Sequence, residues 1–372
     1  MTLVDAPVAG SVPDAFLMLP ALVYRDDPRW IPEDPDDVRA AFGRSNPMLA
    51  RVRGHLFCVP GESRAAAFFD PAIEIDGAPA AFMGYFESRG SAAADATVVA
   101  AVGQWARAQG ARAVFGPVNF STAGNYRVLL SAEPDALPFA GEPYNPPEYA
   151  ARLEAAGFRL RQRYLSQIVG RADFQANIDR RAAATRRCLT RGKYRVIAWE
   201  PAQWAAAAER LFPVVDCTFR ENLGYAPMPF PAFAALLASS VLPRFCPETS
   251  VVALDPAGEI AGFALAYPHY GPLVVQGAGA RRVPMRAVRF DTHAAALREH
   301  PPVGWILKTV GVAPAHRNRG LAEALVMTTT RAIAERADYM IAALIREDNV
   351  SRRILVAVGA ERWYALYGMS LE

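Results

Sequence analysis

The chain has 372 residues, enough for two domains, and 52% of them are hydrophobic while 21% are charged. This composition excludes a disordered protein, and no run approaches the roughly 20 apolar residues of a membrane-spanning helix. The net charge of +3 is too small to indicate nucleic-acid binding by itself.

The N-terminus and the cysteines indicate the compartment. Asp5, Pro13 and Asp14 interrupt the N-terminal segment, so we expect no signal peptide. The four cysteines (Cys58, Cys188, Cys217 and Cys246) show no ligand spacing, which predicts free thiols and no metal site. We therefore expect a cytoplasmic protein.

The first 170 residues alternate between strand-like and helical patterns, which predicts an α/β unit. Prolines crowd the segment 20–37, so we expect an extended lead-in with short turns there. Strands are expected at 56–59, 65–69, 81–86, 113–116 and 160–169, and helices at 92–109 and 149–156.

A basic stretch joins the two halves. Eight Lys or Arg residues lie between residues 171 and 195 against two acidic residues, and the alanines at 182–184 favour a helix. Two interpretations stay open: a solvated helix face, or contact with the phosphates of a cofactor or of RNA.

The second half again predicts strands and helices in alternation. Strands are expected at 194–199, 249–254, 259–267, 305–312, 339–345 and 363–367, and helices at 202–219, 231–239, 320–337 and 351–358. The interval 271–304 is either a lid over an acceptor site or an inserted helix pair. Its arginines (Arg281, Arg282, Arg286 and Arg289) favour an anionic substrate or carrier.

The segment 310–322 carries the clearest chemistry. An apolar strand enters a turn with Arg317, Arg319 and Gly320, and a long helix follows. Gly320 lets a ligand approach the backbone, and the first N–H groups of the helix lack intrahelical acceptors. With the positive end of the helix dipole behind them, these groups suit a pyrophosphate.

The pattern Arg317-x-x-Gly320-x-Ala322, preceded by a strand and Pro314, resembles the acyl-CoA signature of the GNAT superfamily of N-acyltransferases. Asn349 and the later Gly359 resemble its second signature. The resemblance implies a mixed α/β sheet that splays open between the strand before the loop and the strand after its helix. The pantetheine arm of acetyl-CoA, or of another acyl-CoA donor, lies in that splay.

The resemblance also assigns roles to residues. It implies that the amides of Val310 and Val312 face the acyl group and pantetheine, and that Asn349 contacts the pantetheine. It implies a pyrophosphate held by the amides of the loop residues Arg317, Asn318, Arg319, Gly320, Leu321 and Ala322. The position that often holds a tyrosine general acid is Leu355 here.

A wider resemblance covers nearly the whole chain. Residues 27–32, 116–121 and 144–147 are similar to a bacterial group of tandem GNAT-like proteins, whose N-terminal half is a degenerate copy of the fold. Residues 1–170 contain no Arg-x-x-Gly-x-Ala loop, which agrees with that organisation. We therefore predict a degenerate domain at 1–170, a basic linker helix at 171–195 and an acyl-CoA-binding domain at 196–372.

Two residues are candidates for the base that deprotonates an acceptor amine. His269 follows a strand and has an ordinary pKa of about 6.5. Glu221 lies in a loop that often lines the acceptor site of this fold. The resulting hypothesis is an acyl-CoA-dependent N-acyltransferase that acts on a small amine in a ternary complex. Two alternatives remain: an aminoacyl-tRNA donor on the same fold, and a non-catalytic acyl-CoA-binding protein.

Overall fold

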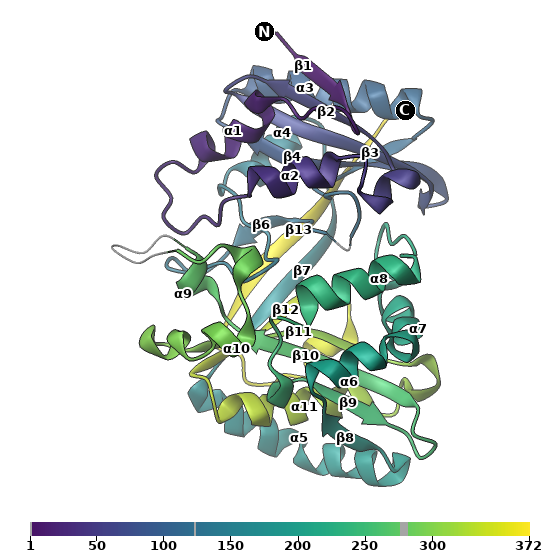
Figure 1. Ribbon diagram of the computed structural model, residues 1–372, viewed down its shortest axis with the longest axis vertical. Helices are drawn as coiled ribbons and strands as arrows, with labels where there is room; N and C mark the ends of the chain where they lie inside the picture. Colours follow the sequence, from purple (N-terminus) through teal and green to yellow (C-terminus); the bar gives the residue numbers. More distant parts are fainter. Residues whose placement is uncertain (1, 123, 276–281) are drawn as a thin grey trace.

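The computed structural model describes residues 2–122, 124–275 and 282–372, which fold around one mixed sheet (Figure 1). Thirteen strands of the described residues make this sheet, in the order β1-β2-β3-β4-β5-β13-β7-β12-β11-β10-β9-β8, with β6 paired to β13. Helices cover both faces of the sheet, so the predicted mixed α/β fold class is confirmed.

The N-terminal half supplies one end of the sheet. In β3 (Ser63–Ile75), Ala67 and Phe69 pack with α3 and α4, while Ala66 and Phe68 pack with α1 and α2. The neighbouring strands are β1 (Val4–Pro7), β2 (Arg53–Val59), β4 (Ala78–Ser88) and β5 (Ala113–Gly116). The helices are α1 (Asp14–Val23), α2 (Pro35–Phe42), α3 (Ala92–Ala108) and α4 (Tyr149–Ala155).

Two central strands are exchanged between the halves. β13 (Ala360–Ser370), yellow in Figure 1, lies between β5 and β7 (Arg159–Gly170) of the N-terminal half. β7 pairs in turn with β12 (Tyr339–Arg346), and the short β6 (Val128–Ser131) also pairs with β13. Each half therefore completes the sheet of the other, and the domain boundaries at residues 170 and 195 stay a prediction.

The C-terminal half supplies the other end of the sheet, with α5 and α11 on one face and α6, α7 and α8 on the other. Its further strands are β8 (Arg195–Ala198), β9 (Val251–Leu254), β10 (Ile260–Pro268) and β11 (Gly304–Val312). Its helices are α5 (Arg171–Gly192), α6 (Pro201–Ala206), α7 (Ala208–Phe219), α8 (Phe230–Leu236), α9 (Gly271–Val274), α10 (Phe290–His293) and α11 (Leu321–Ala334).

The expectation of an extended lead-in with turns at 20–37 agrees with residues 24–34 but is wrong at both ends, where α1 and α2 lie. α1 continues through Pro20, and α2 begins at Pro35 with the Asp34 side chain as its N-cap. Proline is tolerated at the first helical position because its missing N–H would have no intrahelical partner. Phe16, Leu19 and other side chains of α1 are buried against the sheet, and this burial outweighs the local proline signal.

The helices predicted at 351–358 and 202–219 also differ from the structure. Only a 3₁₀ turn at Val350–Arg353 forms in the first segment. The Asn177 side chain of α5 satisfies backbone groups that a helix would have paired internally. Its Oδ1 accepts from the Val356 N–H at 2.7 Å, and its Nδ2 donates to the Ala357 carbonyl at 2.8 Å. The second segment breaks at Ala207 into α6 and α7.

The interval 271–304 connects the two halves of the molecule. Arg286 forms ion pairs with Asp34 and Asp37 of the N-terminal half, whereas Arg281 lies outside the described residues. Within residues 2–122, 124–275 and 282–372, every helix is too short or too polar to cross a lipid bilayer.

Candidate active site

The sheet opens between β11 and β12. These parallel strands pair only where residues 304–307 of β11 lie beside residues 339–342 of β12, although β11 continues to Val312 and β12 to Arg346. Beyond Leu307, β11 stays paired with β10 on its other edge. The edge of β11 that faces β12 therefore has no backbone partner at residues 308–312 in the described structure, and it can pair with the amides of an extended ligand; only the Val312 carbonyl there accepts a side-chain bond, from Arg317 Nε at 3.4 Å.

Irregularities in both strands shape this opening. The pairing of β10 with β11 skips Lys308, because Leu265 faces Thr309 and Ala266 faces Leu307. In β12, the pairing with β7 shifts between Ala342 and Ile345, and the intervening Leu344 has a φ of 60°. Such bulges bend a strand and redirect a side chain.

The corresponding place in the N-terminal half is closed. β4 and β5 pair in parallel at residues 80–82 and 113–115, and the chain after β5 continues alongside β4. The Val118 N–H donates to the Met83 carbonyl at 2.8 Å, and the Tyr85 N–H donates to Asn119 Oδ1 at 2.8 Å. A Cβ on Gly84 would lie 2.3 Å from the Val118 carbonyl oxygen, so no ligand can enter there.

The loop before α11 leaves its backbone donors unused. Gly320 has a φ of 82° and Asn318 a φ of 59°, which turns the chain sharply into the helix. The N–H groups of residues 318–323 have no acceptor within the described part of the chain. Successive free N–H groups at a helix N-terminus form an anion site, and the positive end of the helix dipole strengthens it.

Glu221 bridges the outer ends of the two splayed strands. Its carboxylate lies 3.1 Å from Arg317 Nη1, at the loop that follows β11. Its carbonyl accepts from Arg346 Nη1 at 2.8 Å, at the end of β12. Arg317 also donates to the Cys217 carbonyl at 2.7 Å. The segment after α7 therefore crosses the mouth of the opening, and Glu221 lies at its loop end.

The basic helix α5 lies beside the loop. A Cβ on Gly320 would lie 3.7 Å from Cys188 Cβ of α5, and Arg181 of α5 forms an ion pair with Glu323 of α11 at 3.2 Å. Arg186, Arg187 and Arg191, on the same helix segment as Cys188, are exposed and form no ion pair with any described residue. This cationic surface continues the anion site of the loop.

Comparison with known proteins agrees with this geometry. A family model described as "FR47-like protein" matches residues 288–365. A tandem GNAT protein from the clavulanic acid biosynthesis pathway superposes with a TM-score of 0.51 at 15% identity, over 100% of this chain and 99% of that chain. The chain has a tandem GNAT fold. The predicted resemblance is confirmed at the level of the fold, and the family match at residues 288–365 lies within the C-terminal half.

Other GNAT structures resemble the chain at lower identity. The glucosamine N-acetyltransferase region of a fungal multi-domain β-N-acetylglucosaminidase has a TM-score of 0.52 at 12% identity, over 99% of this chain and 38% of that chain. A probable N-acyltransferase from Enterococcus faecalis has a TM-score of 0.52 at 9% identity, over 100% of this chain and 73% of that chain. No curated protein matches the sequence.

The structure places the sequence candidates of the GNAT site at different distances from the splay. Val310 and Val312 lie at the end of β11, and the chain runs from there directly into the cofactor loop at residues 317–322. Asn349 lies beyond the end of β12 and caps the turn there by accepting from the Ser351 N–H. His269 lies at the opposite end of the parallel pair, since the preceding Pro268 faces Trp305 at the start of β11.

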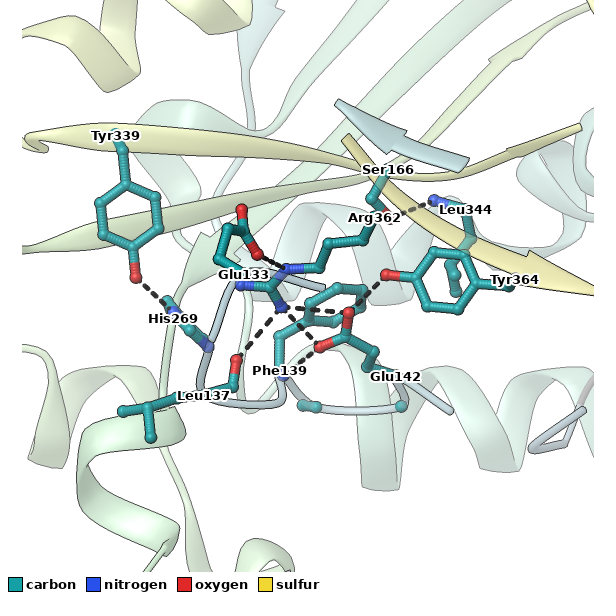
Figure 2. A network of polar contacts seen from close by, with 12 residues as sticks. Glu133, Leu137, Phe139, Glu142, Ser166, His269, Tyr339, Leu344, Arg362 and Tyr364 are labelled. Carbon is teal, nitrogen blue, oxygen red and sulfur yellow. Dashed lines mark hydrogen bonds and ion pairs between the residues drawn. The ribbon is translucent and has the colours of Figure 1, made fainter. Parts of the chain in front are cut away.

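His269 is enclosed between the halves. It is 2% exposed, and its Nδ1 lies 2.6 Å from the hydroxyl of Tyr339 (Figure 2). The pKa of His269 is lowered to about 4, first by burial and then by the positive charge of Arg362, against the opposing effect of the Pro138 and Leu137 carbonyls. The imidazole is therefore neutral and only weakly basic at neutral pH.

This pKa shift has a consequence for stability. Because the unfolded chain takes up a proton near pH 6.5 and the folded chain only near pH 4, His269 destabilises the fold as pH falls through this window. His269→Gln is expected to reduce the stability lost between pH 7 and pH 5 by about 2 kcal/mol. Urea unfolding at both pH values measures it, and an unchanged difference would contradict the shift.

Lys308 is the functional candidate that the sequence reading missed. Its side chain extends from the bulge of β11 on the face that loop 137–142 covers, with Nζ 5.1 Å from the Phe139 ring centre and 3.4 Å from the Gly141 carbonyl. The pKa of Lys308 is lowered to about 7, first by burial and then by the positive charge of Arg127, while Glu142 acts in the opposite direction. No described carboxylate forms an ion pair with it.

A buried polar network fixes the loop that covers Lys308. Arg362 of β13 donates to both carboxylate oxygens of Glu142 at 3.1 and 2.9 Å, and the Tyr364 hydroxyl donates to the same carboxylate (Figure 2). Phe139, on the same loop, packs against Ile306 of β11. The N-terminal half therefore forms one wall of the space around Lys308. The feature of the sequence that could have pointed to Lys308 is the rarity of lysine: of the 40 Lys and Arg residues, only Lys193 and Lys308 are lysines.

Proposed function

We propose that the protein transfers an acyl group, acetyl in the simplest case, from a coenzyme A thioester to the amine of a small molecule. The observation that carries this proposal is the free edge of β11, which leads directly into the unused N–H groups before α11. The thioester supplies an activated acyl carbon. A small amine close to it can attack directly, without a covalent enzyme intermediate.

Each part of the donor has a fitting partner in the chain. The N–H groups of residues 318–323 suit the pyrophosphate, and the edge of β11 at residues 308–312 suits the two amides of pantetheine. The exposed arginines of α5 beside Gly320 suit the remaining phosphate of the nucleotide.

Lys308 suits the role of proton acceptor. It lies at the bulge, on the free edge where the acyl group would sit, and at neutral pH about half of it is uncharged. His269 and Glu221 remain the candidates from sequence, but the first is enclosed with a pKa near 4 and the second is paired with Arg317. An uncharged Lys308 takes the proton that the amine loses as the new amide bond forms.

Calorimetric titration with acetyl-CoA tests the proposal. We expect micromolar binding of one acetyl-CoA per chain, because among the described strands the C-terminal parallel pair opens and the N-terminal parallel pair is closed. Gly90→Glu, before the N-terminal helix α3, is expected to leave both affinity and stoichiometry unchanged. Absence of binding would overturn the proposed donor, and two sites per chain would overturn the assignment of a single site.

The exposed arginines of α5 favour one second candidate, transfer from an aminoacyl-tRNA. RNA binding through Arg186, Arg187 and Arg191 would weaken steeply with salt, because each phosphate contact releases counterions. Titration with tRNA at several salt concentrations separates the two donors: a steep slope together with no acetyl-CoA binding would favour tRNA.

A further inference from the structure

Arg127 is a buried cation without a carboxylate partner. It is 7% exposed, and no described acidic side chain lies within ion-pair distance. The undescribed positions, residues 1, 123 and 276–281, include no Asp or Glu. A buried charge is costly unless it is paired, so a lone arginine in this position calls for an external partner.

The surroundings of Arg127 hold its guanidinium in one orientation. Its central carbon lies 3.6 Å from the ring centre of Tyr126 and 3.9 Å from that of Tyr164. The two rings meet at 88°, so they contact the guanidinium from two sides, and Arg127 Nη2 donates to the Tyr126 hydroxyl. Nε has no acceptor in the described structure. The backbone φ of 89° is a strained conformation for arginine, which is typical of residues held in place for a function.

Arg127 and Lys308 flank the opening between the strands. Tyr164, which stacks on Arg127, pairs with Arg346 at the end of β12, whereas Lys308 lies on β11. Leu344 of β12 packs with Tyr126 and Tyr164 beside Arg127 and also with Phe139 beside Lys308, so both cations lie around the same part of β12. Glu142 forms no ion pair with Arg127, and its two oxygens accept from Arg362 and Tyr364 instead.

We propose that the acceptor amine also carries a carboxylate, as an amino acid does, and that Arg127 binds this carboxylate while the amine faces Lys308. The inference rests on the proposed function and adds the substrate class. Guanidinium and carboxylate match in a planar, two-bond geometry, and the uncharged lysine suits the ammonium end of a zwitterion. The N-terminal half thereby selects the acceptor, and the C-terminal half binds the donor.

The test compares free amino acids with their uncharged amides as acceptors, by thiol release from acetyl-CoA. We expect wild-type kcat/KM to favour the acids by at least about 100-fold, because the amide leaves Arg127 unpaired. Arg127→Gln is expected to reduce this preference to a few-fold without changing the acetyl-CoA Kd. The exposed Arg163→Gln, next to Tyr164, is the matched control and should keep the preference.

The outcomes separate this inference from the proposed function. Loss of acetyl-CoA binding by the wild type would refute the donor site, which calorimetry reports independently. If acetyl-CoA binds but amides react as well as acids, or no amino acid reacts, the acceptor class is wrong. If Arg127→Gln instead changes only the preference for succinyl-CoA over acetyl-CoA, the carboxylate belongs to the donor and the inference is overturned.

A wild-type measurement covers the case in which Arg127→Gln fails to fold. In the presence of CoA, millimolar amino acids that are acceptors should raise the Tm of the wild type, because ligands that bind only the folded state stabilise it. Their amides should not. Equal shifts from acids and amides, or no shift from any acid, would contradict a carboxylate site at Arg127.

Discussion

Gly320→Glu is expected to weaken acetyl-CoA binding by at least about 100-fold, or about 2.7 kcal/mol. The new carboxylate would project from the centre of the row of free N–H groups at residues 318–323, where the pyrophosphate fits. It would repel the phosphates and compete for the same donors. A side chain at a φ of 82° is also strained, which would distort the entry into α11.

Gly77→Glu is the matched control for this substitution. Gly77 has a φ of 76° in the β3–β4 turn, with open space around its Cβ position, so it imposes similar strain and the same charge far from the loop. Calorimetry with acetyl-CoA should give wild-type affinity for this control. Equal loss of affinity in both variants would attribute the effect to global destabilisation and remove support for a phosphate site at Gly320.

Lys308→Met is expected to lower kcat by about 10²- to 10⁴-fold, the usual contribution of a general base, with little change in acetyl-CoA affinity. Since the uncharged lysine is the active form, wild-type kcat/KM should rise as pH increases through about 7 and then level. Lys308→Arg should be inactive across this range, because arginine stays protonated. Lys193→Met, which removes the other lysine, is the control.

Because the chain has only two lysines, the pKa of Lys308 can be measured directly. Protein labelled with ¹³C at the lysine Cε should show two side-chain signals, and Lys193→Met assigns them. We expect the Lys308 signal to titrate near pH 7. A Lys308 midpoint above pH 9 would refute its role as a base.

The sequence predicted the loop at 317–322 because its chemistry is local. Backbone N–H groups, a glycine and a helix N-terminus within six positions are enough to describe an anion site. Lys308 was missed because its properties come from distant residues. Burial under the loop at 137–142 and the charge of Arg127, about 180 positions earlier, cannot be read from the segment around Lys308.

The errors in secondary structure have the same origin. The sequence predicts a helix at 351–358, but Asn177 on α5 binds the backbone of Val356 and Ala357 and holds this stretch open. The proline-rich start was read from local propensity, although α1 and α2 are stabilised by burial against β2, β3 and β4. In both cases a tertiary contact outweighs the local pattern.

The exchange of β13 delays folding of the N-terminal half during synthesis. β5 and β7 leave the ribosome early, but the strand between them consists of residues 360–370. Until β12 and β13 emerge, the nascent N-terminal half holds unpaired strand edges on β5 and β7, which invite pairing with other chains. Folding therefore completes only after nearly the whole chain has been translated, and a gene fragment that stops at residue 170 would encode a product prone to aggregation.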